Sequence, residues 1–270
     1  MRIKTIIRKG SEHKGTDNKG YCEDYLYSYE GDRWLVAATF DGCSDGIDSH
    51  FASALSGKCL RAIIIEAQES FKQDSLTLKD VFTYLVYNFL RSLEEMRLLL
   101  RLPGNEMLST IILLVYDKVT EEGEIIAMGD GIVKINGELC VIDQNNEPEY
   151  PIVYAEKVSK SYADTVEFLE TFKNKWTFHG LEDVTISTDG LLQWRNKSDE
   201  TKSFEEAMNY LITDSEMSHL SVMLARKFNI LKLKKWENKD DIGIIRILKD
   251  EEKNTETENV DNRAVHSESQ

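Results

Sequence analysis

Apolar and polar residues alternate over the first 40 positions, which predicts antiparallel strands. The three strand-like segments are Lys4–Gly10, Asp24–Trp34 and Leu35–Phe40. Gly31 and Asp32 supply turn chemistry before the last of them. From about Ser49 the apolar spacing changes to three and four residues, between Leu60 and Phe71 and again between Leu78 and Leu93. This spacing predicts two amphipathic helices packed on one face of a sheet.

Strand character returns in the middle of the chain and predicts an antiparallel meander. Its segments are Ser109–Asp117, Glu124–Ile135 and Glu138–Asp143. Asn136-Gly137 is a two-residue hairpin signal between the last two. Residues 144–180 hold two prolines and have mixed polarity, which predicts a loop-rich insertion with a short helix around Ala163–Phe172.

The last third of the chain predicts a buried strand at Asp183–Leu192, two helices within residues 203–228 and a final strand at Asp241–Leu248. Strands at both ends of the chain bracket pairs of helices, so the pattern predicts an α+β layered sandwich. We expect one domain over residues 1–249. Residues 250–270 are almost wholly polar and acidic, and we expect them to form a disordered tail.

Composition narrows the class of partners. The net charge of −15 and the pI near 4.9 would repel nucleic acid and anionic lipid, so neither is an expected partner. No run approaches the roughly 20 apolar residues that span a bilayer. The four cysteines show no C-x-x-C spacing, and no signal peptide precedes them. We therefore expect a reducing, cytoplasmic compartment.

Aspartates stand repeatedly where an apolar strand ends or begins. The pairs are Asp41-Gly42, Asp130-Gly131, Asp189-Gly190, Asp240-Asp241 and, at the start of an early strand, Glu23-Asp24. A lone Asp-Gly is usually a hairpin turn. Asp41 and Asp189 are not followed by a partner strand, so a turn does not explain them. For Asp130 the turn explanation stays open.

Carboxylates that converge from several strand ends either share protons or bind a hard cation. Oxygen ligands favour Mg²⁺ or Mn²⁺ over zinc, and no two of the five histidines stand at metal-ligand spacing. No cysteine is followed six residues later by an arginine, which excludes the motif of the phosphatases that use a cysteine nucleophile. The sequence therefore predicts a magnesium or manganese site made of aspartates.

The order of these motifs resembles the metal-dependent protein phosphatases of type 2C, in particular their bacterial members. The chain supplies, in the family's order, Glu23-Asp24, Phe40-Asp41-Gly42, Ser109-Thr110, Gly129-Asp130, Ser187-Thr188-Asp189-Gly190 and Asp240-Asp241-Ile242-Gly243. The resemblance covers roughly residues 10–248. It implies a four-layer αββα sandwich of two antiparallel sheets flanked by helices, with residues 144–180 as a flap-like insertion.

The resemblance also implies roles for individual residues. Asp41 is expected to bridge two metals, with the Gly42 carbonyl on one of them and Asp24 on the same side. Asp189 and Asp240 are expected to hold the other metal. The remaining site residues are Asp130, which matches the position for a third, weaker ion, and Glu23 and Asp241, which would orient the ligands. The implied reaction is direct attack by metal-activated water on phosphoserine or phosphothreonine of a protein, with a Ser/Thr kinase as the opposing partner.

The sequence departs from the family in four places. Lys19 stands where an arginine usually grips the substrate phosphate, and a lysine lacks the bidentate geometry of a guanidinium. Cys43 replaces a frequent histidine, Gly131 follows the Gly-Asp turn, and Gly243 replaces the final hydroxyl residue. These departures leave a second hypothesis, a pseudophosphatase that binds a phosphoprotein or kinase without turnover. The acidic charge and tail leave a third, a regulatory or scaffold protein.

Overall fold

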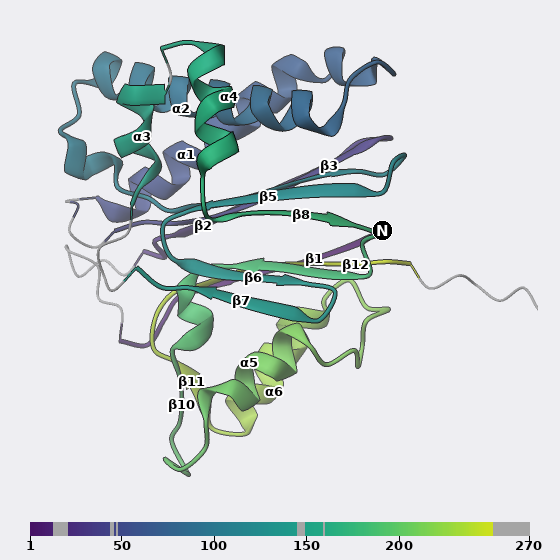
Figure 1. The fold of residues 1–270 in the computed structure, drawn as a ribbon. Helices are drawn as coiled ribbons and strands as arrows, with labels where there is room; N and C mark the ends of the chain where they lie inside the picture. Colours follow the sequence, from purple (N-terminus) through teal and green to yellow (C-terminus); the bar gives the residue numbers. More distant parts are fainter. Residues whose placement is uncertain (13–20, 44–45, 47, 145–148, 159, 251–270) are drawn as a thin grey trace, which may run out of the picture.

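The computed structural model describes residues 1–12, 21–43, 46, 48–144, 149–158 and 160–250. Within these residues, two antiparallel five-stranded sheets lie face to face, and helices cover the outer face of each (Figure 1). The predicted α+β architecture of four layers is confirmed. No helix of the described chain is long and apolar enough to cross a membrane.

The first sheet has the strand order β2-β3-β4-β5-β8. Its strands are β2 (Asp24–Glu30), β3 (Trp34–Asp41), β4 (Ile111–Asp117), β5 (Glu122–Met128) and β8 (Lys175–His179). Side chains of β3 point alternately to both faces, and all but the last residue of the strand are buried. Val36 and Ala38 pack toward the helices, whereas Leu35 and Ala37 pack toward the other sheet. Burial on both faces explains why this strand is a continuous apolar run.

The second sheet has the order β1-β12-β9-β6-β7. Its strands are β1 (Arg2–Arg8), β12 (Ile242–Leu248), β9 (Asp183–Ser187), β6 (Gly131–Ile135) and β7 (Glu138–Ile142). The first strand of the chain therefore pairs with the last, Arg2 opposite Leu248. A separate two-stranded ribbon joins β10 (Trp194–Asn196) to β11 (Trp236–Asn238).

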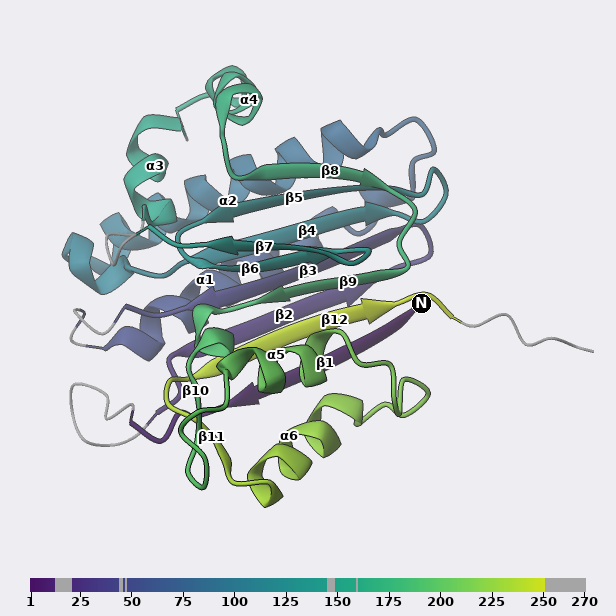
Figure 2. The same cartoon turned by 60° about the horizontal axis from the view of Figure 1, so that its bottom comes forward.

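The helices form the two outer layers (Figures 1 and 2). On the first sheet lie α1 (Ser49–Ala67), α2 (Leu78–Leu100), α3 (Pro151–Val158) and α4 (Tyr162–Thr171). On the second lie α5 (Phe204–Ile212) and α6 (Met223–Leu233), and three short 3-10 helices span Ser70–Lys72, Gly104–Met107 and Asp189–Leu192. The predicted helical segments at 78–93 and 163–172 are confirmed by α2 and α4. The first predicted helix is confirmed as far as Ala67, where α1 ends, whereas Phe71 lies in a separate 3-10 helix.

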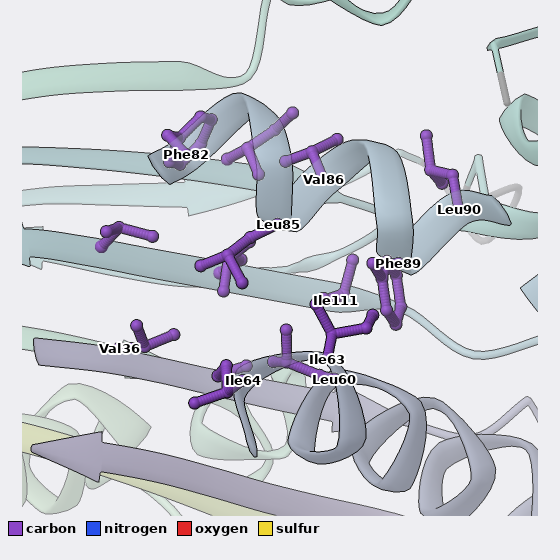
Figure 3. Close-up of a cluster of buried hydrophobic side chains, with 14 of the residues drawn as sticks. Val36, Leu60, Ile63, Ile64, Phe82, Leu85, Val86, Phe89, Leu90 and Ile111 are labelled. Carbon is purple, nitrogen blue, oxygen red and sulfur yellow. The ribbon is translucent and has the colours of Figure 1, made fainter. Parts of the chain in front are cut away.

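The largest apolar cluster lies between α1, α2 and the first sheet (Figure 3). Leu60 and Ile64 of α1 and Leu85 and Phe89 of α2 are each at most 1% exposed, and they contact the outer face of β3 and β4. A capping box starts α2, because the Thr77 hydroxyl accepts a hydrogen bond from the Asp80 N–H and the Asp80 carboxylate accepts one from the Thr77 N–H. These contacts fix the helix layer on the sheet.

A buried polar cluster fixes the opposite helix layer. Arg246 of β12 is 1% exposed and donates to both carboxylate oxygens of Asp183, at 2.9 and 2.8 Å. It also donates to the carbonyls of Leu211, Thr213 and Asp214, which end α5. Lys134 of β6 adds an ion pair to Asp183 at 2.6 Å and a bond to the Ile212 carbonyl. Together these groups tie the C-terminus of α5 to three strands of the second sheet.

The structure corrects the predicted meander. β4 and β5 belong to the first sheet, but β6 and β7 form a hairpin in the second, so the chain changes sheet between Met128 and Gly131. Gly129 and Gly131 both have positive φ, at 100° and 151°, which permits this sharp crossing. The pattern predicted the strands correctly, but not the sheet that each one joins.

Four further helices and strands were not predicted. The stretch 144–180 contains the helix α3 and the strand β8, which forms an edge of the first sheet beside β5, in addition to the predicted short helix. The ribbon of β10 and β11 was not predicted either, because three-residue strands carry too little alternation to be detected.

Candidate functional site

Strand ends from both sheets meet at one end of the sandwich and carry the predicted aspartates. Asp24 begins β2 and lies opposite Asp41, the last residue of β3. In the second sheet, β9 ends just before Thr188 and Asp189, and Asp240 and Asp241 immediately precede the antiparallel β12. Asp41 and Asp189 act on each other's pKa, so the carboxylates of the two sheets lie close together. The antiparallel order therefore places these acidic residues together.

Thr188 links Asp24 to the second sheet. Its hydroxyl donates to Oδ2 of Asp24 at 2.8 Å and accepts from the Gly243 N–H at 2.9 Å. Asp24 is 4% exposed, and its Oδ1 is a buried atom with no hydrogen-bond partner among the described residues. Burial raises the pKa of Asp24 well above its usual range, the Thr188 bond lowers it, and the charge of Asp241 raises it further. A buried carboxylate oxygen without a partner costs free energy unless a proton or cation reaches it.

Asp41 and Asp189 are in the same electrostatic situation. Burial, together with the charges of Asp24, Asp189 and Asp240, raises the pKa of Asp41 well above its usual range. Burial also raises the pKa of Asp189, and the charges of Asp240 and Asp130 add to it. The carboxylates thus repel one another without a cation, as expected for an oxygen-rich cation site.

Asp240 and Asp241 differ in their surroundings although they are adjacent. Asp240 accepts at Oδ2 from the Gln193 side-chain amide at 3.0 Å and at Oδ1 from the Asp241 N–H. Asp241 is 3% exposed and accepts from the N–H groups of Gly10 and Glu23, at 2.7 and 2.6 Å. Asp241 therefore anchors backbone on both sides of the site, whereas Asp240 faces the other carboxylates.

Two glycines are required by the close approach of backbone at this end. A Cβ on Gly190 would lie 1.6 Å from the carbonyl oxygen of Asp241, and one on Gly10 would lie 2.2 Å from the carbonyl carbon of Asp240. The predicted ligand Gly42 is buried, donates its N–H to the Glu23 carbonyl at 3.1 Å and forms a bridge to Ser109.

Asp130 lies in the crossing between the sheets, at the margin of the cluster. Its Oδ1 accepts from the Gln144 N–H at 2.8 Å. Burial raises the pKa of Asp130, and the nearby charge of Asp143 adds to this effect. Because β5 and β6 belong to different sheets, Asp130 is not the turn of a hairpin.

The structure therefore gathers Asp24, Asp41, Asp189 and Asp240, with Asp130 beside them. Glu23, 3% exposed, lies beneath with Asp241. Lys19 falls outside the described residues. Within the described ranges, no group of three or more histidine, cysteine, aspartate and glutamate side chains is placed so that it could hold a metal ion as it stands. The oxygen donors nevertheless fit a hard divalent cation. Positive charge would give Oδ1 of Asp24 a partner and would reduce the repulsion between the carboxylates of the cluster.

Sequence reasoning gave no role to three residues of this end. Thr188 connects two sheets, and the Thr110 hydroxyl accepts from the Asp41 N–H at 3.2 Å. Burial raises the pKa of the Tyr150 phenol, and the nearby Cys43 adds to this effect. The charges of Asp41 and Asp130 also act on it. Thr188 and Thr110 belong to the motifs Ser187-Thr188-Asp189-Gly190 and Ser109-Thr110, but nothing local identifies Tyr150.

Comparisons with known proteins locate the fold. No protein-family model and no curated protein matches the chain. Among solved structures, RsbX in complex with magnesium is 16% identical, with 91% of this chain and 94% of that one covered and a TM-score of 0.50. A bacterial serine phosphatase is 10% identical over 91% and 97% of the two chains, with a TM-score of 0.57. The PPM serine/threonine phosphatase MsPP of Mycobacterium smegmatis, in complex with cacodylate, is 14% identical over 92% and 98%, with a TM-score of 0.51.

At these identities the likeness establishes the fold. The chain has the fold of the bacterial phosphatases of type 2C, also called PPM-type. The resemblance that the motif order indicated is confirmed at this level. The aspartate cluster lies at strand ends of both sheets of this fold.

Proposed function

We propose that this chain is a metal-dependent protein phosphatase that hydrolyses phosphoserine and phosphothreonine with water as the nucleophile. The observation that carries the proposal is the cluster of Asp24, Asp41 and Asp189, one buried and two half-buried carboxylates with raised pKa values at one end of a PPM-type fold. Such a cluster is costly in a folded protein unless it binds cations, so its presence favours a metal site.

Five groups would hold Mn²⁺ or Mg²⁺, two ions to a site: Asp24, Asp41, the Gly42 carbonyl, Asp189 and Asp240. Divalent ions bound there would supply positive charge for the phosphoryl group and lower the pKa of water. Thr188 holds the Asp24 carboxylate, and Asp241 holds the backbone N–H groups of Gly10 and Glu23. Asp130, at the margin, is the candidate ligand for a third, weaker ion.

A direct assay tests this function. We expect an aryl phosphate to be hydrolysed in the presence of millimolar Mn²⁺ or Mg²⁺ and not in the presence of a chelator. Acid quenching should trap no phosphoenzyme, because water attacks phosphorus directly. Undiminished turnover in chelator, or a trapped phosphoenzyme, would contradict the proposal.

The alternative is a pseudophosphatase that binds a phosphoprotein or a kinase. It is motivated by Gly243, which stands in place of the family's final hydroxyl residue. A Cβ at this position would lie 3.2 Å from Oδ2 of Asp24 and 2.9 Å from Leu26, so the geometry leaves little room for a side chain. Thr188 instead supplies a hydroxyl to Asp24. Phosphopeptide binding with no turnover in any divalent metal would favour this alternative.

Lys19 is proposed to contact the incoming phosphate in place of the family's arginine. As a point charge it can hold one phosphate oxygen where a guanidinium holds two. We expect Lys19→Ala to raise KM for a phosphopeptide about tenfold, equivalent to about 1.4 kcal/mol, with kcat little changed, and Lys19→Arg to preserve or improve affinity. Steady-state kinetics on one phosphopeptide measure this. If Lys19→Ala matches the parent in KM and kcat, the residue has no phosphate role.

The substrate class and location follow as proposals. The natural substrate would be a phosphorylated protein, with a cognate Ser/Thr kinase that opposes the enzyme. The four cysteines are free thiols, which fits a cytoplasmic, reducing location.

A further inference from the structure

A basic pocket lies next to the acidic site of this strongly acidic protein. The cavity has a volume of about 440 Å³. Its lining includes four lysines, Lys9, Lys197, Lys232 and Lys235, although the chain as a whole carries a net charge of −15. A concave concentration of positive charge on such a protein marks a place where an anion can bind.

Most of this charge is available to a ligand. Lys197 pairs with Glu237 at 2.7 Å, and Glu237 also pairs with Arg195 at 3.2 Å. Among the described residues, no ion pair is formed by the other three lysines of the pocket. Lys232 lies over the ring of Phe228, 5.0 Å from its centroid, which holds its side chain against the protein. The pocket therefore keeps three cationic groups in excess over its one carboxylate.

The fold constructs the pocket from segments far apart in the sequence. Lys9 follows β1, Lys197 follows β10, and Lys232 and Lys235 come from the end of α6 and the turn into β11. Lys235 has a left-handed backbone with φ of 67°, and the next residue, Trp236, is 4% exposed beneath the cavity. In Figure 2 the ribbon of β10 and β11 lies beside the start of β12.

One side chain joins the pocket to the candidate metal site. The Asn238 amide donates to the Lys9 carbonyl at 3.2 Å and to the Asp240 carbonyl at 3.0 Å. Asn238 also lines the pocket. Asn238 and Asp240 are two positions apart, so their backbones lie within about 7 Å of each other, the span of two extended residues. A peptide could therefore place an anionic side chain in the pocket and its phosphate at the aspartates with only a few residues between the two.

We propose that this pocket binds an acidic side chain that flanks the phosphorylated residue of the protein substrate, so that the enzyme prefers phosphoserine or phosphothreonine in acidic sequence. The inference rests on the proposed function and adds a sequence preference to it. A short acidic segment fits the observations better than a nucleic acid or an anionic membrane, because the acidic remainder of the surface would repel an extended polyanion.

Kinetics on matched peptides test the preference. Two phosphoserine peptides differ only in having glutamates or glutamines beside the phosphoserine, and an aryl phosphate serves as a substrate without flanks. We expect the parent to show a KM about tenfold lower for the glutamate peptide, an advantage that falls with added salt. Lys232→Glu/Lys235→Glu should abolish this advantage and leave kcat/KM for the aryl phosphate unchanged.

A charge-matched control uses Lys72→Glu/Lys79→Glu. These lysines are two-thirds exposed and pair with Glu69 and Glu170, away from the pocket. We expect this variant to keep the preference of the parent for the glutamate peptide. Equal KM values for both peptides in the parent, or a preference that survives in Lys232→Glu/Lys235→Glu, would overturn the docking role.

Direct binding separates this inference from the proposed function. Fluorescence anisotropy of a labelled glutamate phosphopeptide, recorded in chelator, requires no turnover. We expect the pocket variant to bind about tenfold more weakly than the parent and the control. If no substrate is hydrolysed but this difference is present, the phosphatase proposal fails and the docking pocket stands. Equal binding by parent and pocket variant rejects the pocket itself, whatever the turnover.

Discussion

We expect Asp41→Asn to lower phosphatase turnover by roughly 10²- to 10³-fold, the effect typical of removing one electrostatic group that stabilises a transition state. The same substitution should raise the melting temperature of the metal-free protein. Asp41 experiences the charges of Asp24, Asp189 and Asp240, and a neutral amide of the same size removes this repulsion. Opposite effects on activity and on stability are the signature of a carboxylate placed for a cation.

Metal binding supplies a second readout for the same variant. An ion present at 100 times its Kd stabilises the folded state by about 2.7 kcal/mol, and Asp41→Asn should lose most of this gain. Thermal unfolding with and without Mn²⁺ measures both effects. Asp74→Asn is a matched control. Asp74 is exposed and lies near Arg33, which precedes the start of β3, whereas Asp41 is at the other end of that strand. A variant with full turnover and an unchanged metal response would remove Asp41 from the proposed site.

We expect Arg246→Met to destabilise the fold by about 3–5 kcal/mol, the range for breaking a buried ion pair from one side. The substitution leaves Asp183 with Lys134 as its remaining cation and removes the donor from three carbonyl groups at the end of α5. Because these polar bonds act together with the apolar contacts of Leu211 and Ile212, their loss should weaken the packing of that helix end on the second sheet.

Urea unfolding measures this loss, and two further variants locate its cause. Arg91→Met breaks an exposed pair with Glu95 on α2 and should cost about 0.5 kcal/mol or less. Arg246→Met/Asp183→Leu should recover part of the stability, because it also removes the carboxylate that Arg246→Met leaves with a single partner. A loss below 1 kcal/mol for Arg246→Met would mean that water or a rearranged lysine replaces the guanidinium.

The sequence alone determined most of the strands and helices and the positions of the aspartates at strand ends, but not α3, β8, β10 or β11. The helical spacing between Leu78 and Leu93 and the apolar run before Asp41 indicate which faces of these segments are buried. Each segment's own pattern of apolar residues is enough to predict this burial. The motif order from Glu23 to Gly243 was enough to predict the fold that the structural comparisons confirmed. The ligand roles of the aspartates and the domain limits remain predictions.

Only the tertiary structure decided which segments become neighbours. Alternation in β6 shows that it is a strand, but its pairing with β9 in the second sheet depends on the crossing at Gly129 and Gly131. The bond from Thr188 to Asp24 and the pocket that unites Lys9 with Lys232 each join residues more than 150 positions apart. The periodicity of a segment indicates which of its side chains are buried. The strand or helix that it packs against depends on how the whole sheets stack, and no local sequence pattern encodes this arrangement.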